Sequence, residues 1–387
     1  MLLVRSVLRR GRLTHITLAQ ASTELPGLDN RIGPGFGNSG GMDIPITPEA
    51  LDAAVEAESF TGVLTIDVGG ERVLERCEGF AHRALGVLNT PSTRISAASG
   101  SKGFTALVIM RLVEAGELAL TDLVRPLLGE DLPLIDDAVT IEHLLAHTSG
   151  IGDYLDEDGD GDIDDYIFSL PLHVLAETEA FLPALDGFPQ KFPPGERFSY
   201  CNGGYVVLAL IAERVSGRGF HELVQTEVCD RAGLTGSAFL RSDDLPADAA
   251  LGYLDEEGNR TNVLHLPVRG NGDGGMYFTA DDLHRFWNAL LDGRIVSPDS
   301  VAAMTRPRFD VLSEHKRYGM GFWLGRRNSS LILEGYDAGA SFRSTHIPET
   351  RTTVTVLGNS SEGAWPVIYA LADAMDGTVR GKFPDEA

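Results

Sequence analysis

A serine and a lysine three residues apart stand at the start of an apolar stretch, "SGSKGFTALVIM", Ser99 to Met110. Nearly every residue from Gly103 to Val113 is apolar, which predicts a buried helix with Ser99 and Lys102 on one face of its first turn. A buried ammonium loses hydration, so its pKa falls from about 10.4 toward neutrality and the amine becomes a usable base. A hydroxyl beside such a base, at the positive end of a helix, is an activated nucleophile. The pair therefore predicts covalent catalysis.

Lysine is rare in this chain, which makes its use at position 102 informative. Of the 32 lysines and arginines, four are lysines, at positions 102, 191, 316 and 382, and the other 28 are arginines. An arginine keeps its proton in a protein, whereas a buried lysine can lose it. The structural alternative is a lysine that extends to solvent from a serine-capped helix end. A second Ser-x-x-Lys, Ser313 to Lys316, lies among charges with no apolar helix after it, and we interpret it as coincidence.

Two other serines imitate catalytic motifs. The "GNSGG" segment, Gly37 to Gly41, matches a nucleophile elbow, but neither a strand before it nor a helix after it is indicated. In "LAHTSG", His147 precedes Ser149 by two positions, and residues so close in a turn rarely meet as base and nucleophile. We therefore expect His147 to be a loop histidine.

The elements that must position Ser99 and Lys102 come from both ends of the chain. Residues 60–81 alternate and contain a Gly-Gly turn, which predicts a hairpin. Residues 47–58 predict a capped helix, 123–268 predict helical pieces and loops, and 331–360 return to strand-like alternation before a final helix at 364–375. The order predicts an α/β fold of the α+β type: an antiparallel sheet flanked by helices, with an inserted mostly helical domain. We place an irregular extension at 1–45, the sheet domain at 46–122 plus 269–387, and the helical domain at 123–268.

Composition narrows the partners and the location. A formal charge of −24 and a pI near 4.7 argue against a nucleic-acid binder or an anionic-membrane binder, because both need clustered lysine and arginine. Small molecules are the expected partners. No apolar run approaches the 18 or so residues of a membrane span, and arginines at positions 5, 9, 10 and 12 interrupt any signal-peptide core. A cytoplasmic location is the prediction.

The cysteines predict neither a disulfide framework nor a zinc site. Cys77, Cys201 and Cys229 are odd in number and form no CxxC. Buried thiols are expected.

Four blocks together resemble a known family. They are "SAASGSKGFTALVIMRLVEAGELALTD", "TIEHLLAHTSGI", "FPPGERFSYCNGGYVVLALIAERVSG" and "GDGGMYFTADDLHRFWNALLDG". Their order and spacing resemble the serine beta-lactamase and penicillin-binding-protein-like family, which includes class C beta-lactamases, D-alanyl-D-alanine carboxypeptidases, D-aminopeptidases and family VIII carboxylesterases. The resemblance runs from about Phe60 to about Ala374. It implies a beta-lactamase/transpeptidase-like fold, Ser99 as nucleophile, Lys102 as its base, and no cofactor.

The family's second motif, Tyr-x-Asn, falls on Tyr200, Cys201 and Asn202. The resemblance implies that the Tyr200 oxygen exchanges protons with the nucleophile and the leaving group, while the Asn202 amide binds the lysine or the substrate. A tyrosine near a cation ionises more easily than its solution pKa of about 10 suggests. The segment alone would predict only a turn before a helix.

The third motif departs from the family. Lys-Thr-Gly or His-x-Gly is usual, and here the stretch is "EGYDAGASFRS", in which Asp337 to Gly339 is the natural register and Tyr336 the alternative first position. The usual cation is missing either way, which should disfavour anionic peptides and penicillins. Arg343 is a candidate replacement, although a strand arginine facing solvent is the expectation. By analogy with the family, the N–H groups of Ser99 and Ala340 form the oxyanion hole.

The segment "DEDGDGDIDDY" imitates part of a calcium loop. Asp156, Asp158 and Asp160 with Gly161 match the first half of an EF-hand, but position twelve is Ile167 instead of glutamate. We expect an acidic solvated loop, with calcium as the alternative.

These residues predict a serine hydrolase that forms an acyl-enzyme on Ser99, with Lys102 and Tyr200 moving its proton. An esterase acting on small esters is the first prediction. Beta-lactamase, D-Ala-D-Ala carboxypeptidase or D-aminopeptidase activity is the alternative within this mechanism. An inactive binding or scaffold protein of the same fold is the alternative outside it. The sequence makes no prediction of oligomeric state.

Overall fold

The computed structural model describes residues 60–157, 164 and 166–376. Its main sheet has eight strands, and all neighbours for which a register is defined pair antiparallel, in the order β2-β1-β12-β11-β10-β9-β8-β7. Their bounds are β1 Gly62–Val68, β2 Glu71–Glu78, β7 Phe309–Val311, β8 Lys316–Tyr318, β9 Trp323–Gly325, β10 Leu331–Asp337, β11 Ala340–Ile347 and β12 Thr352–Gly358. Both ends of the chain thus build one sheet, as the sequence predicts.

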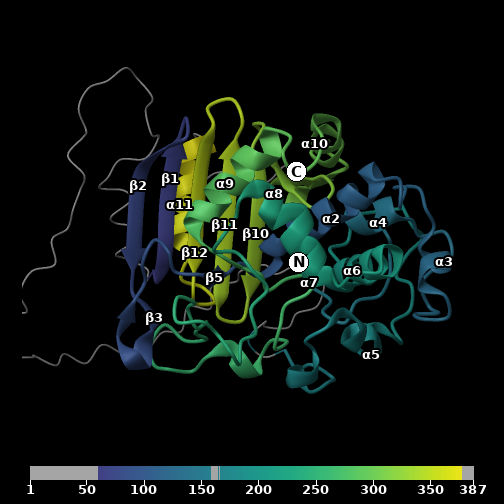
Figure 1. Cartoon of the computed structure of the whole chain (residues 1–387), viewed down its shortest axis with the longest axis horizontal. Coiled ribbons are helices and arrows are strands. Elements are labelled where there is room, and N and C mark those ends of the chain that lie inside the picture. The colour runs from purple at the N-terminus through teal and green to yellow at the C-terminus, as the bar shows by residue number, and fades with distance from the viewer. Residues whose placement is uncertain (1–59, 158–163, 165, 377–387) are drawn as a thin grey trace, which may run out of the picture.

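Two small sheets and a set of helices complete the fold (Figure 1). The small sheets pair β3 (Phe80–His82) with β4 (Val87–Leu88), and β5 (Ile95–Ser96) with β6 (Tyr277–Phe278). The α-helices are α2 Lys102–Glu114, α3 Val124–Leu128, α4 Ile141–Leu145, α5 Leu182–Leu185, α6 Asn202–Ser216, α7 Phe220–Leu223, α8 Asp230–Ala232, α9 Ala280–Leu291, α10 Pro298–Met304 and α11 Trp365–Asp376. Short helical turns lie at η1 Arg83–Leu85, η2 Ala98–Ser101, η4 Leu172–Val174, η5 Thr178–Phe181, η6 Val224–Cys229, η7 Asn262–Leu264 and η8 Leu312–Glu314.

The first hairpin forms where its glycines were expected to turn the chain. Gly69 and Gly70 have φ of 61° and 93°, which glycine adopts at little cost. Strand β1 is buried along almost its whole length because it lies between β2 and β12, whereas β2 alternates between exposed and half-buried residues at the sheet edge. The predicted hairpin is confirmed.

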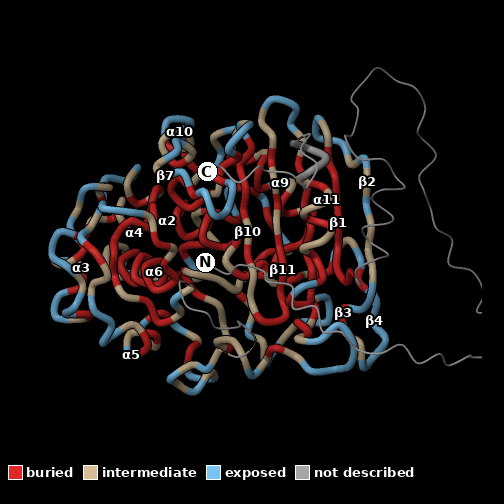
Figure 2. The backbone as a smooth tube through the Cα atoms, turned by 180° about the vertical axis from the view of Figure 1, so that it is seen from behind, coloured by how far each residue is buried: buried red, intermediate tan, exposed pale blue. Residues whose placement is uncertain are grey.

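The two faces of the sheet are covered by different helices because successive strand residues point to opposite sides. On one face, Val63, Phe342 and Leu357 join the core that contains residues of α2 and α9. On the other, Leu64, Val356 and their neighbours pack against α11. Figure 2 shows that buried residues follow the sheet and the central helices.

Helix α2 is the predicted buried helix. Ten of its thirteen residues are buried, and the turn η2, which contains Ser99, leads directly into it. Gly103 allows the close approach of β10, since a Cβ there would lie 2.5 Å from a Leu333 methyl group. The sheet therefore sets the position of the first turn of α2, where the serine and the lysine stand.

The described residues between 123 and 268 form α3 to α8, short turns and loops, beside the sheet (Figure 1). The fold class is as predicted, while the domain boundaries stay a prediction. The 1–45 extension, the helix at 47–58 and the "GNSGG" segment lie outside the described residues.

None of the described helices has the length and apolar character needed to cross a membrane.

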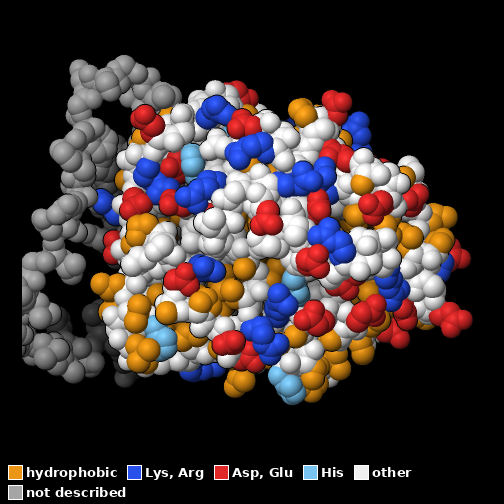
Figure 3. All heavy atoms as spheres, viewed as in Figure 1, with side chains coloured by type: hydrophobic (Ala, Val, Ile, Leu, Met, Phe, Trp, Pro, Cys, Tyr) orange, Lys and Arg blue, Asp and Glu red, His pale blue; other side chains and the backbone are white. Residues whose placement is uncertain are grey.

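The cysteines and the surface agree with the composition. All three cysteines are free; Cys201 and Cys229 are buried, whereas Cys77 is half-buried. On the face seen in Figure 3, basic side chains are interspersed with acidic ones, so this face presents no continuous basic field.

Candidate active site

Ser99 and Lys102 meet at the start of α2. The Lys102 Nζ lies 2.8 Å from the Ser99 Oγ, within hydrogen-bonding distance. The ammonium nitrogen also lies 2.7 Å from the Asn202 Oδ1 and 2.5 Å from the backbone oxygen of Asp273. Only 2% of Lys102 is exposed. The lysine is thus held by three oxygens and does not extend to solvent.

Burial lowers the pKa of Lys102 from its ordinary value. Four carboxyl groups, those of Asp273, Glu157, Asp153 and Asp337, act in the opposite direction, in decreasing order. Desolvation outweighs them, so the direction is the one predicted from the apolar sequence. The amine is easier to deprotonate than an exposed lysine.

Tyr200 completes the cluster but has the opposite pKa behaviour to that expected. The Lys102 Nζ lies 4.9 Å from the Tyr200 ring centroid, and the Tyr200 side chain is close enough to that of Ser99 to interact with it. Burial first, and then the charge of Glu157, raise the pKa of Tyr200 well above 10. The prediction that the nearby cation eases ionisation is wrong, because desolvation dominates. Tyr200 keeps its proton in the resting protein.

Asn202 links the lysine to the acidic side of the cleft. Its Nδ2 donates to the Glu157 Oε1 at 2.9 Å and to the Leu155 oxygen at 3.1 Å, while its Oδ1 faces the lysine. Its own N–H and that of Gly203 donate to the Asp153 carboxylate at 2.5 and 2.8 Å. Asp153 therefore caps the start of α6, although burial raises its pKa to about 7. Sequence reasoning missed both acids.

The third motif is shifted by four residues from its predicted register. A Cβ on Gly335 would lie 2.7 Å from the Ser99 nitrogen, so this glycine is the one that lies against the nucleophile. Gly339 instead sits in the β10–β11 turn with φ of 72°, close to the backbone of Gly252. The register that placed the motif glycine at Gly339 is wrong. The motif's first position falls on Leu333, whose side chain is buried.

Ala340 is also displaced from its predicted role. It begins β11, pairs with Asp337 and does not line the cleft. Strand β9 pairs with β10 only at Leu331 and Ile332, and beyond them β10 runs past η2. The nearest strand to the Ser99 N–H is therefore β10, so the second donor of an oxyanion hole is not expected from β11.

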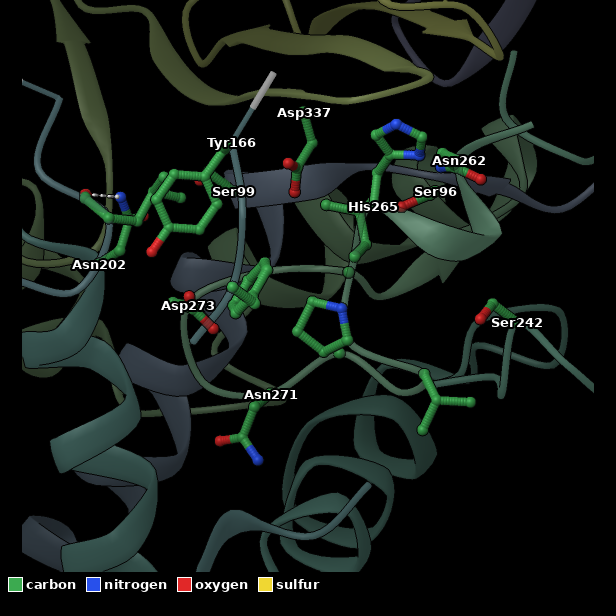
Figure 4. A pocket seen from close by; sticks show the side chains of 18 of the residues that line it. Ser96, Ser99, Tyr166, Asn202, Ser242, Asn262, His265, Asn271, Asp273 and Asp337 are labelled. Atoms are coloured by element: carbon green, nitrogen blue, oxygen red, sulfur yellow. Dashed lines mark hydrogen bonds between the residues drawn. The ribbon is translucent and has the colours of Figure 1, made fainter. Parts of the chain in front are cut away.

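Tyr336 and Asp337 border the cleft differently. The Tyr336 hydroxyl donates to the Glu362 Oε1 at 2.6 Å, and its ring lies 5.9 Å from that of Trp365. The Asp337 carboxylate points into the cleft (Figure 4). Of these two side chains, that of Asp337 is therefore the one directed into the cleft, and its contact with a substrate stays a prediction.

The cleft beside Ser99 is acidic. Its empty volume, including space that is open to solvent, is about 880 Å³. Its described lining contains no lysine or arginine, but three acids, Glu157, Asp273 and Asp337. Burial and then the charge of Asp273 raise the pKa of Asp337 to about 7, and burial likewise raises that of Asp273, whose carboxylate accepts from the Tyr154 hydroxyl. The other lining residues include Ser96, Tyr166, Phe168, Asn262, His265 and Tyr277.

Arg343 does not replace the missing cation. It is paired with Glu334, which also binds Lys316, and its side chain is 12% exposed. The expectation of a solvent-facing arginine is wrong, and Arg343 does not line the cleft. The Ser313–Lys316 pattern gives no second nucleophile, because Lys316 is held in this ion pair.

His147 lies in the loop after α4, as predicted, but it is not exposed there. It is completely buried, its ring stacks on Tyr200, and its Nδ1 accepts from the Cys201 N–H at 3.0 Å. No contact with the Ser149 hydroxyl accompanies this arrangement in the described structure, in line with the rejection of a Ser–His pair.

The calcium alternative stays a prediction. The Asp156 carboxylate is paired with Lys191 at 2.8 Å. Asp158 and Asp160 lie outside the described residues. In the described part of the chain, no three His, Cys, Asp or Glu side chains are grouped to hold a metal ion.

The fold and the site define a class. An antiparallel sheet beside a helical part, with a serine and a buried lysine at the start of a central helix, is the arrangement of a serine hydrolase. The family model described as Beta-lactamase matches residues 49–376. The chain therefore belongs to the beta-lactamase family, and the resemblance is confirmed.

Penicillin-binding proteins and an esterase are among its relatives. The crystal structure of a penicillin-binding protein from Bacillus halodurans is 36% identical, has a TM-score of 0.78, and covers 83% of this chain and 99% of that one. Esterase EstB of Burkholderia gladioli is 30% identical over 304 residues, 70% of this chain and 76% of the esterase. Penicillin-binding protein 4 of Amycolatopsis lactamdurans is 32% identical over 254 residues, 62% of each chain.

Proposed function

We propose that this protein is a serine esterase that acts through an acyl-enzyme on Ser99. The observation that carries the proposal is the 2.8 Å contact between the Lys102 Nζ and the Ser99 Oγ at the start of a buried helix. Lysine in its neutral form takes the hydroxyl proton as the Ser99 oxygen bonds to the ester carbonyl carbon. The contact is short enough for this transfer without rearrangement.

The remaining groups have assigned roles in the reaction. The N–H groups of Ser99 and Tyr336 hold the oxyanion, since Tyr336 follows the glycine that lies against the nucleophile. Tyr200, which keeps its proton, donates it to the departing alkoxide and regains a proton from Lys102. Water then attacks the acyl-enzyme and returns the proton to Ser99, which releases the acid.

The cleft favours small esters that are uncharged or positively charged. Carboxylates of Glu157, Asp273 and Asp337 line it without a lysine or arginine to bind an anionic group. A penicillin or a peptide C-terminus would bring its own carboxylate against these acids, and like charges repel in a poorly solvated site. Beta-lactamase, D-Ala-D-Ala carboxypeptidase or D-aminopeptidase activity stays the alternative, and the names of the penicillin-binding relatives favour it.

A labelling experiment and a substrate panel test this proposal. A fluorophosphonate probe should add once to the wild-type protein and not to Ser99→Ala, as measured by intact-protein mass spectrometry. Turnover of p-nitrophenyl acetate should exceed that of nitrocefin, and both should be lost in Ser99→Ala. Faster nitrocefin turnover would overturn the esterase assignment, whereas a wild-type protein that takes no label would identify a binding or scaffold protein.

A further inference from the structure

His147 follows α4 in an uncommon backbone conformation. Its φ is 56°, in the left-handed region where histidine and asparagine are more frequent than most residues other than glycine. The residue is completely buried. Such a conformation persists only where the surroundings hold it in place.

Two hydrogen bonds join His147 to the residues on either side of Tyr200. The Ser199 N–H donates to the His147 backbone oxygen at 2.9 Å, and the Cys201 N–H donates to its Nδ1 at 3.0 Å. One residue therefore fixes the chain immediately before and immediately after the tyrosine.

Only one neutral tautomer of the His147 ring can accept the hydrogen bond from the Cys201 N–H. Because Nδ1 accepts a hydrogen bond, the proton of the neutral ring lies on Nε2, which has no hydrogen-bond partner in the described structure. A phenylalanine would avoid this unpaired N–H, but it would leave the buried Cys201 N–H without an acceptor. Burial first, and then Lys102, lower the pKa of His147 well below 6.5, so the acceptor is kept.

The same ring also packs against the phenol. The centroids of His147 and Tyr200 lie 4.3 Å apart with the planes 29° from parallel. His147 is itself supported by Tyr205 and Tyr318, each with its centroid 4.9 Å away. The Tyr205 hydroxyl donates to the Leu145 oxygen at 2.8 Å, which ties α6 to the end of α4.

We propose that His147 is a positioning residue for Tyr200, whose backbone it holds on both sides and whose ring it supports. This inference rests on the proposed role of Tyr200 in proton transfer. His147 does not line the cleft, and no hydrogen bond joins it to Ser99 in the described structure, so it acts through the tyrosine. Displacing the phenol by about 1 Å is expected to slow the reaction roughly 10- to 100-fold.

The test uses a substitution that keeps the backbone conformation. In His147→Asn, the side chain tolerates positive φ and retains an acceptor near Nδ1, but the ring is lost. We expect kcat for p-nitrophenyl acetate to fall roughly 10- to 100-fold with KM changed less than about threefold. His315→Asn is the matched control, since His315 is exposed and has φ of 51°. It should leave both constants unchanged.

A double-mutant cycle separates positioning from a general structural role. Values of kcat for ethyl acetate, whose ethoxide leaving group takes a proton from Tyr200 in the proposed reaction, are measured for the wild type, His147→Asn, Tyr200→Phe and the double variant. The histidine substitution should lower kcat roughly tenfold or more with Tyr200 present, and less than about threefold in the Tyr200→Phe background. If His147→Asn melts before it can be assayed, His147→Gly, which also accepts positive φ, is measured by the same criterion.

The outcomes distinguish this inference from the proposed function. Equal slowing in both backgrounds, or a kcat within about threefold of wild type, would overturn the positioning role while Ser99 labelling remains. Loss of labelling specificity for Ser99 would instead overturn the esterase.

Discussion

Two carboxyl groups on β10 are three residues apart and have pKa values that are shifted in opposite directions. Glu334 lies against Lys316 and Arg343, and these two cations hold its pKa down to about 2 although burial alone would raise it. Asp337 lies at the cleft, where burial and the charge of Asp273 raise its pKa to about 7. An odd separation along a strand places the two side chains on opposite faces.

The difference shows how one strand serves two purposes. On the Glu334 side, negative and positive charges are matched, so the carboxylate is ionised and structural. On the Asp337 side, no lysine or arginine lines the cleft, so a positively charged ligand could pair with the negative charge of this carboxylate. In our proposal, the paired carboxylate of Glu334 stabilises the fold, and the carboxylate of Asp337, which has no lysine or arginine partner in the cleft lining, contacts the substrate.

Removing the charge of Glu334 should have the largest effect of the three predictions, and this effect is on the free energy of unfolding. Glu334→Gln removes the carboxylate that pairs with Arg343 and leaves Lys316 only Glu314, 3.6 Å away, which is expected to lower the free energy of unfolding by about 3–5 kcal/mol. Urea denaturation measures it. Glu75→Gln is the control, because Glu75 pairs with Arg72 at 2.7 Å while 40% exposed, and should cost less than about 1 kcal/mol. Equal losses in both variants would contradict the comparison.

Removing the charge of Asp337 should change the preference of the cleft for positively charged substrates. Acetylthiocholine and its uncharged isostere 3,3-dimethylbutyl thioacetate differ in one permanent positive charge. Asp337→Asn should raise KM for the cationic ester roughly 10- to 100-fold, equivalent to about 1.5–3 kcal/mol, and leave the neutral ester unchanged. Asp310→Asn, at an exposed residue of β7, is the matched control and should change neither. A parallel change for both esters would remove Asp337 from substrate recognition.

The smallest expected effect is in pH dependence. The ordinary pKa of an aspartate is 3.8, and that of Asp337 in the folded protein is about 7, so its carboxyl is protonated below pH 7 and ionised above it. KM for acetylthiocholine should therefore fall about tenfold between pH 6 and pH 8. Steady-state kinetics should show no such fall in Asp337→Asn or with the neutral ester. A fall that persists in the variant would belong to another group.

Local patterns predicted Ser99 and Lys102, and the family resemblance added Tyr200 and Asn202. The apolar run after Ser99 gave a buried helix, and burial predicted the lowered pKa of Lys102. The Tyr-x-Asn segment correctly placed Tyr200 and Asn202 near the lysine because its position before α6 follows from the family's motif order.

The rest depended on distances that no local pattern contains. Gly335 and Gly339 both suited the third motif, and only the approach of β10 to Ser99 separates them. Asp153 and Asp273 come from distant loops, so their convergence on Lys102 was not visible. The direction of the Tyr200 pKa was mispredicted, because burial outweighs the cation and burial depends on the whole fold.

The backbone contact at residue 335 also limits how the gene can change. Any single-nucleotide change that replaces this glycine with another amino acid adds a Cβ. At position 335 that carbon would lie 2.2 Å from the Ala97 oxygen. The Ala97 oxygen and the Ser99 nitrogen beside it are backbone atoms, which cannot move aside as the tip of a flexible side chain can. Any amino-acid substitution at position 335 therefore requires the strand to move away from the nucleophile, and it is excluded for as long as selection maintains that spacing.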